Sequence, residues 1–165
     1  MSVSVQEADF DAGAEIAALS NGRDDVGALA SFVGLVRADK AAEGISGAGD
    51  APAVQAMTLE HYPGMTEKAL EAIVTEARGR WDIQGARVIH RVGKLQPGDR
   101  IVFVAVASAH RGEAFAACEF IMDYLKTRAP FWKKEETADG GRWVDARASD
   151  DHAAGRWDNV QNRAT

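Results

Sequence analysis

The feature that most constrains the fold is an apolar run, IVFVAVASA (101–109), followed by a segment with helical spacing. A run with no charged residue suits a strand in the centre of a sheet, where both faces are covered. Residues 112–127 then predict a helix, which ends before Pro130 because proline lacks an N–H and restricts the residue before it. The inward stripe of this helix is predicted to comprise Phe115, Cys118, Met122 and Leu125, with Ile121 beside it.

The other elements follow an order typical of an α+β protein, an antiparallel sheet with helices on one side. We predict strands at 2–6, 26–37, 54–62, 86–95, 100–109 and 142–146, and helices at 11–19 and 66–81. The segment 26–37 is apolar enough to be a buried strand. Asp11 and Thr66 stand where side chains cap the first turns of the two further helices.

The length of 165 residues predicts a single domain, since domains usually run roughly 100–200 residues. Within this domain (1–165), the Ala/Gly-rich stretch 38–55 is predicted to be a mobile surface loop, and 149–165 a polar tail. No stretch reaches the ~18 consecutive apolar residues of a membrane span, and the N-terminus lacks the pattern of a signal peptide. These features predict a cytoplasmic protein without a membrane segment, and the lone Cys118 agrees because it forms no intrachain disulfide.

The overall charge argues against some classes of function. With a net charge of −6, the chain is not expected to bind nucleic acid, because general nucleic-acid binders are basic overall or along a large stripe. The histidines form no HxxH or HExxH pattern, so no metal site and no cofactor are expected. Any site for an anion must therefore be local.

One stretch does gather positive charge. YLKTRAPFWKKE (124–135) holds four cations beside three aromatic rings. The bend at Ala129-Pro130 can fold Lys133 back toward Lys126, and two amines in a partly dry pocket repel one another, so one of them could act as an acid or base. The same pair could instead hold an anion without catalysis, and a charge run is often a solvated face.

A second candidate site is the junction between the apolar strand and the helix that carries Lys126. A helix N-terminus presents free N–H groups to an anion, and His110 and Arg111 would add a titratable ring and a bidentate fork. Arg37 ends another apolar strand. We expect these residues to converge with the two lysines in one electropositive hollow, although His110 could be an ordinary loop histidine and Arg37 an edge salt bridge.

At the level of whole motifs, the chain resembles a known family. LEHYPGMTEKAL (59–70), VGKLQPGDRIVFVAVASAHR (92–111), FIMDYLKTRAPFWKKE (120–135) and RWVDAR (142–147) are similar to the MoaE family, the large, catalytic subunits of molybdopterin synthase. The likeness covers about residues 26–157 in consistent order, and LKTRAPFWK is a long, specific signature. The first 25 residues carry little resemblance.

The resemblance implies an α/β-hammerhead-like fold with an antiparallel sheet and helices packed on it. It implies a sulfurtransferase of molybdenum cofactor biosynthesis, which converts cyclic pyranopterin monophosphate to molybdopterin by inserting two dithiolene sulfurs. The sulfur comes from the C-terminal Gly-Gly thiocarboxylate of a small ubiquitin-like partner subunit. The large subunits form a homodimer within a heterotetramer.

The resemblance also implies roles for residues at the matching positions. Lys126 and Lys133 become the catalytic pair. The implied substrate-binding residues are Leu35, Val36, Arg37, His110, Arg111, Lys134, Glu135, Arg147 and Phe32. These cations suit the reaction, because a phosphate and a thiocarboxylate must meet in one pocket and their repulsion has to be offset.

Two other functions remain open at this stage. The chain could be a non-catalytic adaptor that binds a ubiquitin-like tail in a basic groove, which separate measurements of binding and turnover would distinguish. It could also be a sensor of a phosphate ligand, which would bind the pterin without any partner.

Overall fold

The computed structural model describes residues 2–38, 53–144 and 148–158. The strands are β1 (Val3–Gln6), β2 (Ala28–Leu35), β3 (Ala56–His61), β4 (Ile83–Arg91), β5 (Gly93–Leu95), β6 (Arg100–Ser108), β7 (Phe131–Thr137) and β8 (Gly140–Val144). The helices are α1 (Ala12–Ser20), α2 (Met65–Arg80), α3 (Arg111–Arg128) and α4 (Ala148–Gly155). The strands form two four-stranded sheets, in the orders β1-β4-β6-β2 and β5-β3-β7-β8.

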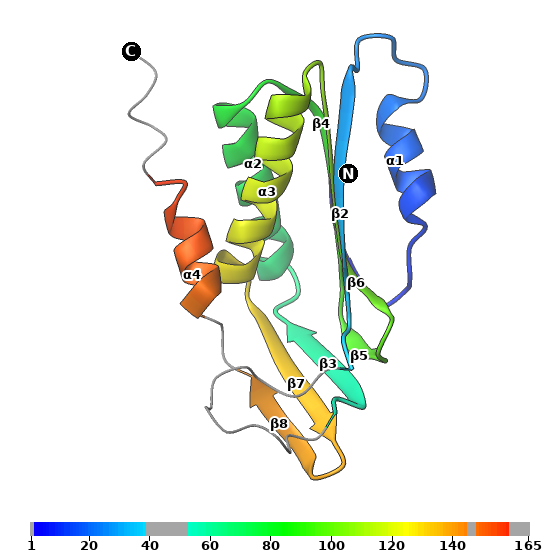
Figure 1. Cartoon of the computed structure of the whole chain (residues 1–165), viewed down its shortest axis with the longest axis vertical. Coiled ribbons are helices and arrows are strands. Elements are labelled where there is room, and N and C mark those ends of the chain that lie inside the picture. Colours follow the sequence, from blue (N-terminus) through cyan, green and yellow to red (C-terminus); the bar gives the residue numbers. More distant parts are fainter. Residues whose placement is uncertain (1, 39–52, 145–147, 159–165) are drawn as a thin grey trace.

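The larger sheet carries the main core. β6 lies between β4 and β2, and its residues 102–108 are all buried, so the predicted central strand is confirmed. Figure 1 shows α2 and α3 on one side of this sheet and α1 on the other. The α+β class is confirmed, but the expected placement of all helices on one side is wrong. The sheet is also mixed, because β1 pairs with β4 in parallel.

The second face of the larger sheet has its own small core beneath α1. Phe10, Ile89, Phe103 and Ala105 are buried there, with Ile16 and Leu19 of α1 packed against them. Asp11 caps α1 as predicted, since its Oδ1 accepts the Ala14 N–H at 3.1 Å. An apolar stripe on a short helix is therefore enough to cover this side of the sheet.

The predicted burial of 26–37 is wrong. β2 is an edge strand of the larger sheet, and its Leu29, Phe32 and Leu35 side chains are 39%, 42% and 52% exposed. The expected inward position of Phe115 on α3 is also wrong, because this ring is 65% exposed. An apolar composition does not say whether a strand lies at the centre or the edge of a sheet.

The smaller sheet differs most from the prediction. The strand expected at 86–95 is two strands, because Gly93 adopts a φ of 81° and directs the chain from β4 of one sheet into β5 of the other. The strand β7 was not predicted, because Pro130 and the cations after it were interpreted as a bend. The last strand, expected at 142–146, is β8 at Gly140–Val144.

The start of α2 also departs from the prediction. Gly64, with a φ of 83°, is the N-cap in place of Thr66, and its N–H donates to Glu67 Oε2 at 2.6 Å. Thr66 is fully buried, accepts the Tyr62 N–H at 3.1 Å and donates to the Pro130 carbonyl at 3.3 Å. Its hydroxyl therefore joins the start of α2 to the bend after α3.

The C-terminal segment packs on the body of the molecule through residues 148–158. α4 packs on α3, and Trp157 lies edge-on to Trp81 and Phe120, with ring centroids 5.4 and 5.6 Å away. The predicted polar tail 149–165 thus includes a helix, while 159–165 and most of the predicted loop 38–55 lie outside the described residues. In the described ranges, no helix is long and apolar enough to span a membrane.

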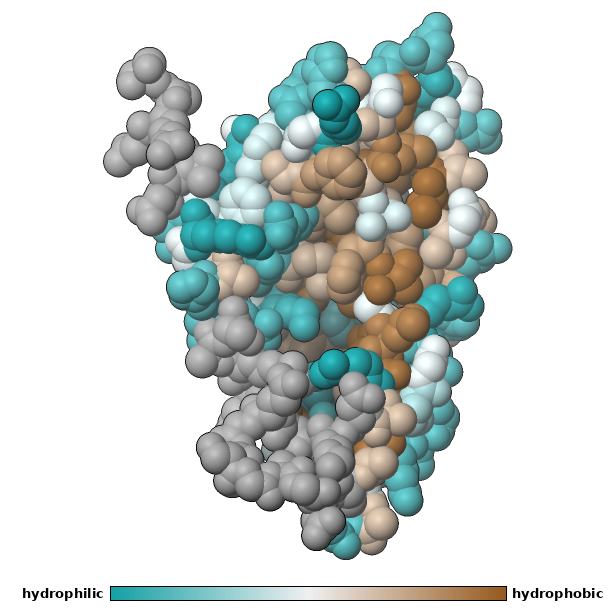
Figure 2. Space-filling view, in the orientation of Figure 1, coloured by the Kyte–Doolittle hydropathy of each residue, from teal (hydrophilic) through white to brown (hydrophobic). Residues whose placement is uncertain are grey.

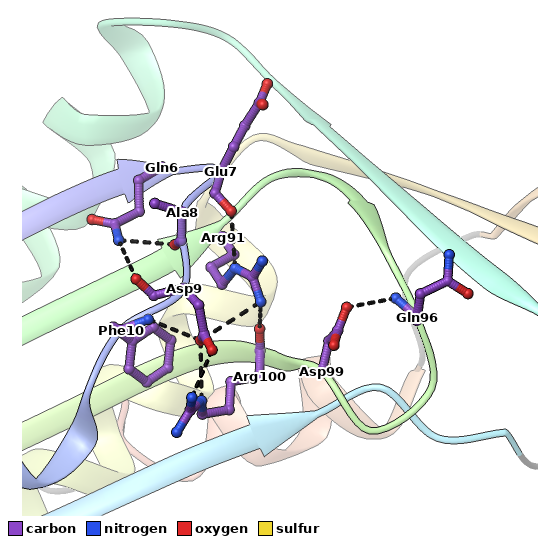
Figure 3. Close-up of polar contacts among 9 residues, drawn as sticks. All are labelled: Gln6, Glu7, Ala8, Asp9, Phe10, Arg91, Gln96, Asp99 and Arg100. Atoms are coloured by element: carbon purple, nitrogen blue, oxygen red, sulfur yellow. Dashed lines mark hydrogen bonds and ion pairs between the residues drawn. The ribbon is translucent and has the colours of Figure 1, made fainter.

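An ionic network fixes the connection between β1 and α1 (Figure 3). Asp9 lies 2.6 Å from Arg100 and 3.7 Å from Arg91, and it accepts the Phe10 N–H at 2.8 Å. The hydrogen bond from Arg100, with the Phe10 N–H and the nearby positive charges, lowers the pKa of Asp9 to about 2. The N-terminal segment is thereby tied to the start of β6.

Candidate functional site

The bend between α3 and β7 is held from several sides. The Ala129 N–H donates to Leu125 O at 3.4 Å, and the Phe131 N–H donates to Ala129 O at 2.9 Å. Thr66 holds the Pro130 carbonyl between them. The bend therefore sets the separation of Lys126, in the last turn of α3, from Lys133, on β7.

The two lysines converge on a buried histidine of β4. Burial, assisted by the positive charges of Lys126, Lys133 and His61 and opposed by a hydrogen bond to the Arg91 carbonyl, lowers the pKa of His90 to about 4. Charges act in this way only over short distances. Lys126 and Lys133 thus both lie near the His90 ring.

His90 itself was missed by the sequence analysis. Its ring stacks on Phe131, with centroids 3.8 Å apart and planes 20° from parallel, and its Nδ1 lies 2.8 Å from Arg91 O. A carbonyl oxygen only accepts, so Nδ1 carries a proton. The lowered pKa keeps the ring neutral near pH 7. A lone histidine inside an apolar strand gives no signal of such a neighbourhood.

Side chains on β7 alternate between two faces. Lys133 and Glu135 share one face, where they pair across the strands with the buried Leu59 and Met57 of β3. Lys134 lies on the other face, 5.9 Å from the Trp143 ring, so it does not accompany Lys133. Alternation therefore separates two lysines that were expected to line the same pocket.

Glu135 is the acidic member of the Lys133 face. It is 7% exposed, and its Oε2 has no hydrogen-bond partner among the residues that the structure describes. The Arg142 guanidinium on β8 lies 3.5 Å from this oxygen, too far for a strong charge-assisted hydrogen bond. A buried acceptor is thus available next to Lys133.

The end of β2 lies at the same end of the molecule as the lysines. Leu35 pairs with Arg100 at the start of β6, and α3 runs antiparallel to β6, so the last turn of α3 returns to this end (Figure 1). Val36 is buried, and its N–H donates to Asp99 O at 2.9 Å, while Arg37 is exposed. Phe32 lies three residues before Leu35 in β2, and Arg147 lies outside the described residues.

His110 and Arg111 lie at the opposite end of α3. His110 is the N-cap, with no hydrogen bond from its side chain to the helix, and Arg111 is the first helical residue; both are exposed. At 1.5 Å per residue, Arg111 and Lys126 are about 22 Å apart along the helix. Within one chain, the expected convergence of the lysines with this junction is therefore wrong.

Other features of the fold lie away from the lysines. An open hollow of about 460 Å³ between α1 and the larger sheet is lined by Ser4, Glu15, Ala18, Leu19, Ala86 and Arg87. Cys118 is buried, and burial raises the pKa of its thiol to about 11. Across 2–38, 53–144 and 148–158, no three His, Cys, Asp or Glu residues are grouped to hold a metal ion.

Comparison with known proteins identifies the family. A model of the MoaE protein family matches residues 5–128. The chain belongs to this family. A molybdopterin synthase catalytic subunit of Ralstonia nicotianae is 63% identical over 163 residues, which cover 99% of this chain and 88% of that protein. Its counterpart in Escherichia coli is 58% identical over 135 residues, which cover 82% of this chain and 84% of that protein.

Solved structures of MoaE proteins share the fold. The molybdopterin biosynthesis MoaE protein of Burkholderia ambifaria superposes with a TM-score of 0.77 at 55% identity, covering 95% of this chain and 97% of that one. A chain from a Helicobacter pylori complex of subunits 1 and 2 of molybdopterin-converting factor has the same fold, with a TM-score of 0.68 at 17% identity, and covers 89% and 92%. The predicted MoaE fold and the predicted identity as a molybdopterin synthase catalytic subunit are therefore confirmed.

Proposed function

We propose that this MoaE chain transfers sulfur to cyclic pyranopterin monophosphate, with Lys126 and Lys133 as its catalytic amines. The carrying observation is that Lys126, in the last turn of α3, and Lys133, on β7, flank the bend whose Pro130 carbonyl is held by Thr66, and both charges lower the pKa of the buried His90. The relatives are catalytic subunits of molybdopterin synthase, a name that implies at least one further subunit. A small ubiquitin-like protein with a C-terminal thiocarboxylate fits that role.

The arrangement of charges supports this chemistry. A pterin phosphate and a thiocarboxylate repel one another, and fixed cations at the place where they meet offset that repulsion. Lys126 and Lys133 supply two such charges, and Arg37 follows the end of β2 at the same end of the molecule. Glu135, with an oxygen that has no hydrogen-bond partner among the described residues, is available to accept a proton or orient an amine.

The first test is the rate of molybdopterin formation by Lys126→Ala. The purified variant is mixed with the pterin and with a small ubiquitin-like protein ending in a Gly-Gly thiocarboxylate. We expect a loss of about 100-fold, the usual range for a positioned acid or base, while binding of the small protein persists. Lys94→Ala, which removes an exposed lysine that pairs with Glu136, is the matched control. A Lys126→Ala rate near that of the control would refute the assignment.

We also propose that two copies of the chain associate through β2. This strand is an edge of the larger sheet, and the exposed apolar residues Leu29, Phe32 and Leu35 lie along it, with Phe115 on the adjacent helix. Figure 2 shows a band of hydrophobic residues along the face that presents this edge. Long apolar edge strands commonly pair with another strand.

A two-fold axis at this edge would unite the separated site residues. Two β2 strands related by such an axis run antiparallel, so the start of one lies beside the end of the other. Eight residues of β2 span about 27 Å at 3.4 Å each, and eighteen residues of α3 span about 27 Å at 1.5 Å each. His110 and Arg111 of one copy would then approach Arg37 and the lysines of the other.

Complementation between two inactive variants tests this arrangement. Lys126→Ala and Arg111→Ala are unfolded together and refolded as a mixture. Because half of the random dimers are mixed and each mixed dimer has one intact site, activity should recover to about a quarter of the wild type. Leu29→Asp should give a monomer by light scattering, whereas Trp143→Asp, exposed on the smaller sheet, should not. No recovery in the mixture, with each variant folded and dimeric, would contradict the shared site.

The remaining features of the assembly follow from this scheme. We propose one domain over 1–165, a central homodimer with one small subunit at each end, and a cytoplasmic location. The last of these is supported by the lone cysteine, which forms no intrachain disulfide. Size-exclusion chromatography with the small subunit tests the heterotetramer.

A further inference from the structure

The contact between His90 and Phe131 joins the two sheets at the place where the lysines converge. His90 belongs to β4 of the larger sheet, and Phe131 is the first residue of β7 in the smaller sheet. The contact therefore spans the bend whose two sides carry Lys126 and Lys133. We infer that His90 is a positioning residue for the lysine pair, because its ring holds Phe131, and with it the start of β7, in place relative to the last turn of α3.

The backbone alone constrains this part of β7 weakly. Pro130 has no N–H to donate, and the Phe131 N–H donates to Ala129 within the bend. Phe131 pairs with His61 only at the end of the β3–β7 ladder, where strands fray. The stacked ring at 3.8 Å gives this end of the strand a contact that the ladder does not.

The His90 ring is itself held in one orientation. It is 6% exposed, and its Nδ1–H donates to the Arg91 carbonyl at 2.8 Å. This hydrogen bond fixes the plane of the ring against which Phe131 lies. A stacked pair of this kind fixes the mutual position of the elements that carry it better than aliphatic contacts do, since ring pairs have a preferred geometry.

The neutrality of the ring suits its neighbours. Three groups that carry or can carry positive charge act on it: Lys126 from α3, Lys133 from β7 and His61 from β3. A cation at position 90 would repel both lysines, whereas a neutral flat ring supports the bend without adding charge. An aliphatic side chain would be neutral as well, but it would not keep the ring contact.

This inference rests on the proposed role of the lysines, so the experiment measures both. The rate constant at saturating pterin, the pterin concentration at half-maximal rate and the affinity for a thiocarboxylated ubiquitin-like protein are determined for several variants. His90→Leu removes the ring, His90→Phe keeps it without the nitrogens, and Phe131→Leu cuts the same contact from the other side. Ile89→Ala is the control, because Ile89 is buried on the opposite face of β4.

We expect His90→Leu and Phe131→Leu each to lower the rate constant about tenfold, since small misplacements of catalytic groups cost this much or more. Both binding parameters should stay within about twofold, as for a change that acts on the reaction step alone. His90→Phe should keep the rate constant within about threefold. The double variant that combines His90→Leu with Phe131→Leu should be no slower than either single variant, because the effects of residues in contact are not additive. Ile89→Ala should destabilise the fold while keeping the rate constant.

Several results would overturn the inference. They are a wild-type rate constant for folded His90→Leu, equal losses for His90→Phe and His90→Leu, or additive losses in the double variant. If His90→Leu does not fold, Phe131→Leu and His90→Phe decide by the same criteria. Lys126→Ala, measured alongside, separates the two levels: its full activity would refute the proposed function, whereas its inactivity beside a fully active Phe131→Leu would refute only the role of His90.

Discussion

Acid should destabilise the chain through His90 before it affects most carboxylates. Burial, assisted by Lys126, Lys133 and His61, lowers the pKa of this ring from 6.5 to about 4 in the folded chain. Between these two values the unfolded chain binds a proton that the folded chain does not. The free energy of unfolding therefore falls as the pH falls from about 6.5 to about 4, and His90 contributes no further change outside that window.

The size of the effect follows from the two pKa values. A difference of one pKa unit corresponds to about 1.4 kcal/mol, so the full window is worth about 3 kcal/mol, and about 2 kcal/mol of it is lost by pH 5. Domains of this size are stable by only about 5–15 kcal/mol. A loss of about 2 kcal/mol from one buried imidazole would therefore be a substantial part of the total free energy of unfolding.

Urea unfolding followed by tryptophan fluorescence measures this loss. The wild type and His90→Phe are each unfolded at pH 7 and pH 5, and the other histidines are common to both chains. We expect the wild type to lose about 2 kcal/mol more than the variant between the two pH values. Equal losses in the two proteins would show that His90 is protonated normally in the folded chain and would refute the reasoning.

Three further predictions concern stability and reactivity. Asp9→Asn should lower the free energy of unfolding at pH 7. This difference from the wild type should disappear as the pH falls from 3.8 toward about 2, where Asp9 loses its charge in the folded state. A difference that persists in urea unfolding at pH 2 would contradict this prediction. Trp157→Ala should lower the free energy of unfolding by about 3–5 kcal/mol, because it empties the contact with Trp81, and a loss below about 1 kcal/mol would exclude firm docking of α4. Cys118, with a buried thiol whose pKa is raised to about 11, should react with a disulfide reagent only on unfolding; rapid reaction in native buffer would be the opposite result.

The parts of the fold that local sequence determines were predictable. The charge-free run of β6 and the proline after α3 act on their own residues, so a central strand and the end of a helix follow from them. Whether β2 is central or at an edge depends on its neighbours, and its composition is equally apolar in both cases. The same limit applies to Phe115, whose helical spacing fits the inward stripe although its ring is 65% exposed.

For the candidate site, the sequence predicted that the two lysines approach one another and missed His90, whose pKa both of them lower. Lys126 and Lys133 are close in the chain, so a bend at Pro130 is enough to predict that they approach. The contact of His90 with Phe131 joins residues that are distant in the chain, so no local sequence pattern predicts it. Recognition of β7 as a strand would have separated Lys134 from Lys133 at once, since alternate residues face opposite ways.

The two edges of the larger sheet differ in what they permit. β1 has four residues and is followed by the acidic Glu7 and Asp9, whereas β2 has eight residues and a row of exposed apolar side chains. Short, charged edges resist the addition of further strands. If two copies join through β2, only β1 edges remain on the larger sheets, so these sheets are not extended beyond a pair. A mutation that lengthened β1 or removed those acids would open the way to polymerisation into filaments.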